Sequence, residues 1–129
     1  MSAVLLDTHA WVWSLMDDAQ LSAAARAAIV AADAVQVSPI SFFEIGQKVR
    51  LGKWPQMESL ARRLPELLQE QGGLVASMTP EICLRASLMD WAHRDPFDRM
   101  LLATAHVTGV PLISKDAVFA GRSEVQVIW

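Results

Sequence analysis

The sequence has one cysteine, Cys83, among its 129 residues. A single thiol cannot form an internal disulfide, and it cannot build a cysteine-type zinc site, which needs two or more thiolates at a defined spacing. No apolar stretch reaches the ~18 residues that a membrane span requires. The first residues lack the basic segment of a secretory signal, and Asp7 interrupts the apolar run that ends at Leu6. We therefore expect a soluble, cytoplasmic protein with no membrane association, in which residues 1–129 form one domain.

Short motifs of several enzyme classes are also missing. The chain contains no glycine-rich phosphate loop, no H-E-x-x-H metal motif, no G-x-S-x-G nucleophile motif and no Cys-x-x-Cys pair. A nucleophilic triad has no support beyond the presence of serine and histidine. His9 follows closely enough on Asp7 to approach the same site, whereas His93 and His106 are as readily explained as ordinary helix residues.

Positive charge is in short supply, since 11 lysines and arginines face 14 acids and the formal net charge is −3. Proteins that hold nucleic acid mainly through its phosphates are usually basic. Either nucleic acid is not the ligand, or a bound cation changes the sign of the charge locally.

Apolar residues, by contrast, are abundant. They make up 53% of the chain, which includes five tryptophans and six methionines. That share is high for a small soluble monomer. It indicates either a tightly packed core or an apolar face that another chain covers.

Short apolar runs alternate with helical patterns along the chain. The expected strands are residues 3–6, 35–37, 74–78, 110–114 and 125–128. The expected helices are residues 21–32, 39–51, 57–71, 80–91 and 96–109. Pro65 should bend or interrupt the third of these helices. Strands that alternate with helices indicate an α/β fold, and such apolar strands suit a sheet covered on both faces. We therefore expect a mainly parallel sheet of four to five strands flanked by helices.

Two acids follow directly on expected strands. Asp7 comes immediately after residues 3–6, and Asp116 lies two residues beyond residues 110–114. Ligands of open parallel sheets bind outside the carboxyl ends of the strands, so topology alone places both acids at the ligand edge. A structural role competes at each position. Asp7 is a preferred helix N-cap, although Thr8 could cap instead, and Asp116 could form an Asx turn.

Further acids stand on expected helices, and local physics explains part of their presence. Glu44 is a lone acid among apolar neighbours, and an i,i+4 ion pair with Lys48 accounts for it well. Asp95 is a helix N-cap and can also pair with Arg99 at i+4, so it is fully accounted for. A capping box explains Asp98 only in part. If one of these two aspartates binds a metal ion, Asp98 is the better candidate.

Four short motifs occur in a fixed order along the chain. They are Leu5-Leu6-Asp7-Thr8-His9, Ser41-Phe42-Phe43-Glu44-Ile45, Asp95-Pro96-Phe97-Asp98-Arg99-Met100-Leu101 and Ile113-Ser114-Lys115-Asp116. Each motif is weak alone. Together they resemble the PIN-domain nucleases, most closely the VapC-type toxins of bacterial toxin–antitoxin pairs. The resemblance spans nearly the whole chain, at the expected size.

This resemblance implies a PIN-like α/β domain that acts as a metal-dependent endoribonuclease and as the toxin of such a pair. The acidic quartet of the family maps onto Asp7, Glu44, Asp98 and Asp116, with Mg²⁺, or Mn²⁺ in its place, as cofactor. Mg²⁺ prefers hard oxygen ligands, and it relieves the repulsion between the acids and a phosphodiester. An ion held by the three aspartates, with Glu44 as a ligand or a water-orienting base, would activate water to cut RNA. The expected products carry 5′-phosphate and 3′-hydroxyl ends.

The resemblance also implies supporting residues and partners. Ser114 would orient an acid or a bound water, with Thr8 as a second supporting residue. The partners would be an RNA substrate, a cognate antitoxin bound along an apolar groove, and a second copy in a homodimer. With core packing as the alternative, the candidate apolar surface residues are Trp11, Trp13, Phe42, Phe43 and Trp54. With a solvated helix face as the alternative, the candidate RNA contacts are Lys48, Arg50, Lys53 and Arg99, joined by Arg62 and Arg63.

Two other functions fit parts of the pattern. A phosphoacceptor receiver domain is also α/β and of similar length, but it needs an acidic pair after the first strand, where Asp7 is followed by Thr8 and His9. A PIN-like module that has lost catalysis and only binds RNA or protein is the second alternative, and the intact quartet argues against it. DNA also stays open as a substrate, because no residue pattern reads a 2′-hydroxyl.

Overall fold

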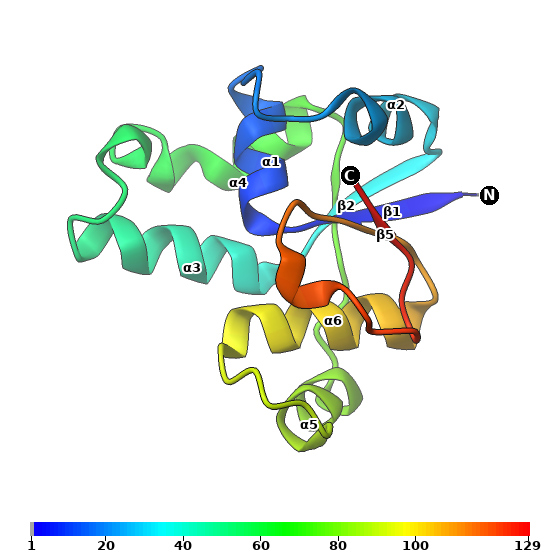
Figure 1. Ribbon diagram of the computed structural model, residues 1–129. Helices are drawn as coiled ribbons and strands as arrows, with labels where there is room; N and C mark the ends of the chain where they lie inside the picture. Colours follow the sequence, from blue (N-terminus) through cyan, green and yellow to red (C-terminus); the bar gives the residue numbers. More distant parts are fainter. Residues whose placement is uncertain (1) are drawn as a thin grey trace.

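Strands and helices alternate along the chain in the computed structural model, which describes residues 2–129 (Figure 1). The strands are β1 (Ala3–Leu6), β2 (Ala34–Val37), β3 (Leu74–Val75), β4 (Leu112–Ile113) and β5 (Val127–Ile128). The helices are α1 (Thr8–Leu15), α2 (Ala23–Ala31), α3 (Pro39–Arg50), α4 (Leu64–Glu70), α5 (Pro80–Leu88) and α6 (Pro96–Thr108). Three 3₁₀ turns complete the list: η1 (Pro55–Met57), η2 (Ala61–Arg63) and η3 (Ala117–Phe119).

The five strands form one sheet in the order β3-β2-β1-β4-β5, and every neighbouring pair is parallel. This confirms the predicted α/β fold with a parallel sheet. The chain builds outward from β1 to β3 and then crosses to the other side of β1 to add β4 and β5. The direction of winding therefore reverses between β1 and β4, where ligands of such sheets bind. Leu6 lies opposite Ile113, so the residues that follow these two strands meet at one edge.

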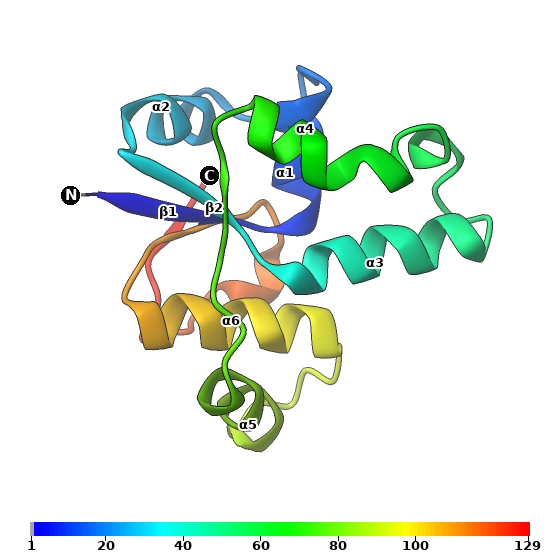
Figure 2. The same cartoon turned by 180° about the vertical axis from the view of Figure 1, so that it is seen from behind.

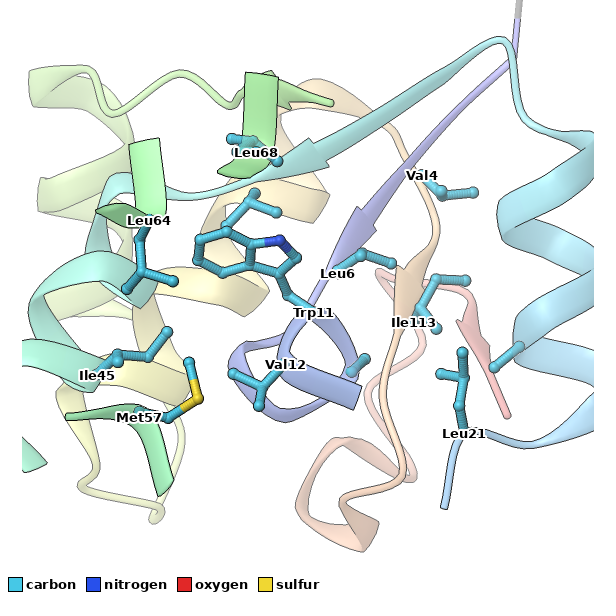
Figure 3. Packing of buried hydrophobic residues seen from close by; sticks show 13 residues of the cluster. Val4, Leu6, Trp11, Val12, Leu21, Ile45, Met57, Leu64, Leu68 and Ile113 are labelled. Carbon is cyan, nitrogen blue, oxygen red and sulfur yellow. The ribbon is translucent and has the colours of Figure 1, made fainter. Parts of the chain in front are cut away.

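Helices cover both faces of the sheet (Figure 2), with α1, α2 and α4 on one side and α5 and α6 on the other. Successive strand side chains point to opposite faces, so β1 supplies both cores. Leu6 belongs to the cluster around Trp11 on the first side, which Figure 3 shows. Leu5 belongs to the second cluster, with Leu101 of α6. Both leucines of β1 are at most 1% exposed, as expected for a sheet covered on both faces.

Capping residues that are legible in the sequence set most helix boundaries. The hydroxyl of Ser22 accepts a hydrogen bond from a backbone N–H at the start of α2, and Ser38 and Thr79 do the same for α3 and α5. At the other end of α6, Gly109 adopts the left-handed conformation with φ 71°, which glycine reaches without strain. None of the helices described in residues 2–129 is long and apolar enough to cross a membrane.

The prediction of a helix over residues 57–71, bent or interrupted at Pro65, is wrong for its first half. Two 3₁₀ turns, η1 and η2, come first, and only Leu64–Glu70 forms an α-helix. Pro65 stands in the first turn of that helix, where its missing N–H and fixed φ suit a helix start. The sequence pattern also misses α1, because Thr8–Leu15 is only eight residues long and its apolar residues show little helical periodicity.

The aromatic residues expected at a surface differ in how far their side chains are exposed. Trp11 is 0% exposed, its indole N–H donates to Gln71 Oε1 at 3.0 Å, and its ring lies 4.9 Å from that of Phe42. Core packing therefore explains Trp11, and a surface role for it is wrong. Phe43 is 62% exposed, whereas Trp13 is partly buried.

Candidate metal centre

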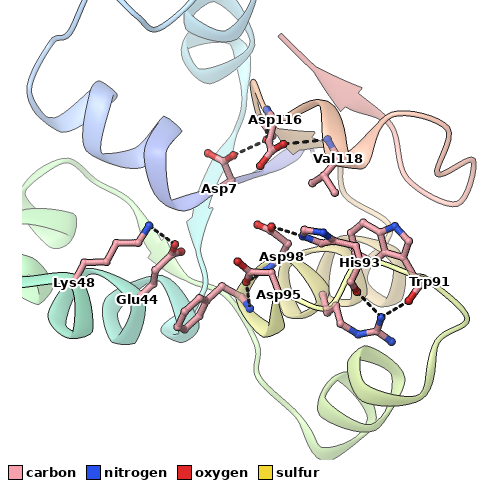
Figure 4. A network of polar contacts seen from close by, with 12 residues as sticks. Asp7, Glu44, Lys48, Trp91, His93, Asp95, Asp98, Asp116 and Val118 are labelled. Carbon is pink, nitrogen blue, oxygen red and sulfur yellow. Dashed lines mark hydrogen bonds and ion pairs between the residues drawn. The ribbon is translucent and has the colours of Figure 1, made fainter. Parts of the chain in front are cut away.

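A pocket of about 590 Å³ lies at the edge where β1 and β4 end. Its volume falls within the ~300–1,000 Å³ that is usual for ligand sites. The lining residues are Asp7, Thr8, His9, Trp13, Glu44, Lys48, Asp95, Asp98, Leu101, Lys115, Asp116 and Ala117. The structure thus brings all four predicted acids to one pocket, together with Asp95 (Figure 4).

Asp7 is held by the start of α1 and by the neighbouring strand. One carboxylate oxygen accepts a hydrogen bond from the backbone N–H of Ala10 at 2.7 Å, so Asp7 is the N-cap of α1. The idea that Thr8 could cap in its place is wrong, because the Thr8 hydroxyl donates to Ser41 Oγ at 2.9 Å. The second oxygen of Asp7 accepts a hydrogen bond from the hydroxyl of Ser114. Both carboxylate oxygens are therefore oriented, and Asp7 is only 7% exposed.

Ser114 ties the two strand-end acids to each other. Its hydroxyl donates to Asp7 and accepts a hydrogen bond from the backbone N–H of Asp116 at 3.0 Å. Asp116 in turn accepts from the backbone N–H of Val118 at 3.0 Å and caps η3, as an Asx turn would. One buried hydroxyl thus positions a side chain and a backbone segment together.

The start of α6 contributes two acids and a histidine. Asp95 Oδ1 accepts hydrogen bonds from the backbone N–H groups of Phe97 and Asp98, at 2.8 and 3.2 Å, and caps the helix as predicted. The Asp98 carboxylate lies 2.7 Å from His93 Nε2. Asp98 is therefore oriented by a histidine from the preceding loop, and His93 is not the helix residue that the sequence allowed.

The guanidinium of Arg99 donates its hydrogen bonds to backbone carbonyl oxygens and makes no ion pair with Asp95. Its five N–H donors bind the carbonyl oxygens of Ala86, Ser87, Met89, Trp91 and His93 at 2.6–3.3 Å. The expected i,i+4 pair is thus wrong. The guanidinium has five donors in all, so none is left for the RNA contact expected of it. Arg99 instead anchors the α5–α6 loop that carries His93.

Glu44 forms the ion pair expected from its spacing and also lies in the pocket. Its Oε2 lies 2.8 Å from Lys48 Nζ, which is the i,i+4 pair expected from spacing. Both side chains also line the pocket, and Glu44 is 8% exposed. Burial is the main cause of the raised pKa of Asp7, and the negative charge of Glu44 adds to it.

The pocket disfavours the ionised form of its own aspartates. Burial raises the pKa of Asp7, and hydrogen bonds from Ser114 and Ala10 offset this only in part. Burial also raises the pKa of Asp98 to about 6, helped by the charges of Asp95 and Asp116 and opposed by His93. Desolvation and like charges together destabilise carboxylates unless a cation neutralises them. The hard oxygen donors of these acids are of the type that Mg²⁺ and Mn²⁺ prefer, so the residues present fit a divalent ion.

One trio of possible ligands lies closer together than the quartet. Within residues 2–129, His93, Asp95 and Asp98 form the one group whose ligand atoms lie within 4.8 Å of one another. The sequence pattern does not single out His93 as a ligand, and capping alone accounts for Asp95 in it. Capping uses one oxygen of Asp95, and the loop before α6 brings His93 back onto the helix start. No spacing rule signals that return.

The basic residues expected to contact RNA are spread widely. Lys48 lines the pocket, whereas Arg50 and Lys53 are exposed near the end of α3. Arg62 and Arg63 are exposed in η2, outside the pocket lining. Lys115 also lines the pocket, although it is not among the RNA contacts expected from the sequence.

Comparisons with known proteins agree with this geometry. The family model of the PIN domain matches residues 4–124. Ribonuclease VapC22 of Mycobacterium tuberculosis is 33% identical over 120 residues, which is 90% of this chain and 88% of that protein. A toxin-antitoxin complex from Klebsiella pneumoniae contains a chain with TM-score 0.66 and 20% identity, covering 95% of this chain and 94% of that one. VapBC2 from Rickettsia felis, bound to a DNA fragment from its promoter, gives TM-score 0.64 and 12% identity, covering 97% and 96%. At these identities the two structures show a likeness of fold.

Proposed function

The chain belongs to the PIN-domain family, and on that premise we propose that it is a metal-dependent endoribonuclease of the VapC type, the toxin of a toxin–antitoxin pair. One observation carries the nuclease proposal. Asp7, Glu44, Asp98 and Asp116 come from four separate segments, and all line one pocket at the reversal point of the sheet. Membership in the family also displaces the receiver-domain alternative.

The acids of the pocket have different roles in the proposed reaction. Asp7, Asp98 and Asp116 would hold Mg²⁺ or Mn²⁺, because their oxygens are of the hard type that these ions prefer. Such an ion, when bound, lowers the pKa of a water and neutralises charge on a phosphodiester. Lys48 fixes Oε2 of Glu44, so this carboxylate can orient a water across the pocket.

Two further contacts keep the acids in place. Ser114 orients Asp7 through a hydrogen bond from its hydroxyl. His93 orients Asp98 in the same manner through its Nε2 at 2.7 Å. Outer partners of this kind typically change metal affinity or activity by ~10–100-fold when they are removed.

A cleavage assay on single-stranded RNA tests the nuclease proposal. The native protein should cut with Mg²⁺ and stop with EDTA, and Asp7→Asn should lower the rate at least ~100-fold. Asparagine keeps the oxygen that accepts from Ala10, so the cap of α1 survives. Asp90→Asn is the matched control, since Asp90 is exposed and outside the pocket lining. Equal cleavage under all four conditions would refute the site and favour a PIN-like module without catalysis.

The toxin role rests on the relatives, because one matched structure is a toxin-antitoxin complex and the 33% identical relative is a ribonuclease of the VapC name. We expect expression of the native chain to arrest growth, and expression of Asp7→Asn to leave growth unaffected. A neighbouring antitoxin gene, co-expressed, should restore growth. Because RNA is the proposed target, this activity belongs in the cytoplasm. Continued growth with an RNA-cutting native chain would remove the toxin role and leave the nuclease.

We also propose a homodimer, in line with the apolar composition of the chain. Leu84 and Leu88 of α5 are 60% and 78% exposed, and Phe43 of α3 is 62% exposed. Exposed apolar side chains of this size favour coverage by a second chain. Sedimentation equilibrium at micromolar concentration should give twice the monomer mass of 14.2 kDa. A monomer at that concentration would contradict the dimer.

A further inference from the structure

Three aromatic rings contact one another in a row, and two of them line the acid pocket. The ring of His9 stacks on Trp54, with centroids 5.0 Å apart and planes 28° apart. The same ring lies 5.7 Å from Trp13, and Trp13 lies 5.7 Å from Trp129. His9 and Trp13 line the pocket directly. We name His9, Trp13 and Trp54 the aromatic rim.

Two lysines sit on the rings of this rim. Lys48 Nζ lies 5.4 Å from the ring centre of Trp54, and Lys115 Nζ lies 5.8 Å from that of Trp13. Both lysines line the pocket as well. The pocket lining therefore holds two ammonium groups next to five carboxylates, and these two positive charges favour the approach of a polyanion along the rim. Its chemistry, rings interleaved with cations, matches a strand of phosphates and bases.

Core packing accounts for these rings less well than it accounts for Trp11. Trp11 is 0% exposed, which is the outcome when a tryptophan serves stability. Trp13 and Trp54 pack against the same core but stay partly exposed, and His9 is exposed. Rings that stay exposed or partly exposed in or next to a polar pocket offer apolar area to a ligand.

We propose that the aromatic rim is a stacking platform for unpaired bases of single-stranded RNA, next to the phosphodiester that enters the acid pocket. The inference builds on the proposed function, since RNA is its ligand. Every base has a π-face, so a stacking platform tolerates different sequences. Bases in a duplex are already stacked on each other and cannot offer those faces, so the platform selects single strands.

Binding of a fluorescently labelled single-stranded RNA, followed by anisotropy, tests the platform. The Asp7→Asn background keeps the RNA intact during the titration. In that background, His9→Ser and Trp54→Leu should each weaken binding about 5- to 150-fold, the range for one lost base stack. Trp54→Phe and His9→Phe keep an aromatic ring and should stay within about threefold of the parent. An RNA duplex of the same length should bind the parent and the variants alike.

A second exposed histidine supplies a matched control. His106 lies on α6 outside the pocket lining, so His106→Ser should leave RNA binding unchanged. Thermal unfolding of each variant checks its fold. His9 is exposed, so His9→Ser decides the question even if Trp54→Leu fails to fold.

Three results would overturn the platform. They are unchanged single-strand binding in His9→Ser and Trp54→Leu, an equal loss in His106→Ser, and an equal loss for duplex RNA. If the first result comes together with an altered oligomeric state, the rim is a protein contact.

The platform and the nuclease can fail separately. If the native chain cuts RNA and the rim variants bind normally, the platform is removed and the nuclease stands. If the native chain binds single strands through the rim but cuts none, the nuclease is removed and the platform stands.

Discussion

The two sides of the pocket are built by different means. On the acid side, Asp7, Asp95 and Asp116 are all N-caps, so backbone N–H groups at the start of a helical segment fix each carboxylate. On the other side, His9 and Trp54 are held by ring-to-ring stacking. Backbone hydrogen bonds orient an oxygen closely, whereas stacked rings accept a range of partners.

On the acid side each position needs one particular residue, whereas on the rim any aromatic residue can serve. An aspartate that caps a helix and also faces the pocket serves two purposes, and even asparagine can replace it in only one of them. A ring on the rim can be exchanged for another ring. The contrast also bears on how a chain of net charge −3 could bind a polyanion. Lys48 and Lys115 line the same pocket as the acids and lie over rings of the rim.

The largest effect should come from the acid side, with Asp98→Asn. We expect the single-turnover rate of RNA cleavage to fall at least ~100-fold, because a ligand oxygen and a negative charge are lost. The fold should not suffer, since Asp98 is already disfavoured as an anion in the metal-free pocket. A rim variant such as Trp54→Leu should mainly raise KM. If both variants lose maximal rate to a similar extent, the acid side and the rim do not have the different roles proposed for them.

A smaller effect should follow from Ser114→Ala. This change removes the hydroxyl that orients Asp7 and should lower cleavage ~10–100-fold. Ser114→Thr keeps the hydroxyl and should recover most of the activity. If alanine and threonine behave alike in the cleavage assay, the hydrogen bond to Asp7 has no role in catalysis.

Stability should depend on pH in the direction set by the raised pKa of Asp98. Its pKa is about 6 in the folded chain against an ordinary 3.8, and burial shifts Asp7 in the same direction. The folded state thus holds these protons more tightly, so their contribution is complete below about pH 4 and is lost as the pH rises through about 6. Urea unfolding of EDTA-treated protein should show a loss on the order of 1–3 kcal/mol across that window. The sequence change Asp98→Asn should flatten the dependence.

Mg²⁺ should reverse part of this loss, because it binds the ionised acids. Its stabilising effect on thermal unfolding should be small near about pH 5 and larger near about pH 8. A Mg²⁺ effect that is the same at both values would show that the ion binds elsewhere.

The smallest effect should come from Lys115→Gln on the rim. One cation fewer should weaken RNA binding a few-fold and reduce the slope of affinity against salt by about 0.7–1. Fluorescence anisotropy at several salt concentrations measures both. Arg62→Gln is the control, since Arg62 lies outside the pocket lining, and an equal change in slope there would place the RNA path outside the rim.

The sequence was most informative where a residue has a fixed place relative to the ends of an element. Asp7 and Asp116 follow parallel strands, so topology places them at one edge whatever the side chains do. Asp95 and Gly109 bound α6 by local rules of capping, and both boundaries are as predicted. These signals depend on neighbours in the chain alone.

The remaining features depend on the tertiary fold and leave no local pattern. Arg99 reaches carbonyls up to 13 residues away because α5 packs on α6. His93 meets Asp98 only because that loop turns back. The rim joins His9 to Trp54 across 45 residues of sequence. Within residues 57–71, spacing suggested a helix and tertiary packing divided it into shorter turns.

A titration of the metal-free protein with Mn²⁺, followed by electron paramagnetic resonance, tests most directly whether the acid pocket holds a divalent ion. The native chain should bind Mn²⁺, and Asp7→Asn and Asp98→Asn should each weaken that binding at least ~tenfold. Asp90→Asn should bind as the native chain does, because Asp90 lies outside the pocket lining. Equal Mn²⁺ affinity in all four proteins would contradict the account.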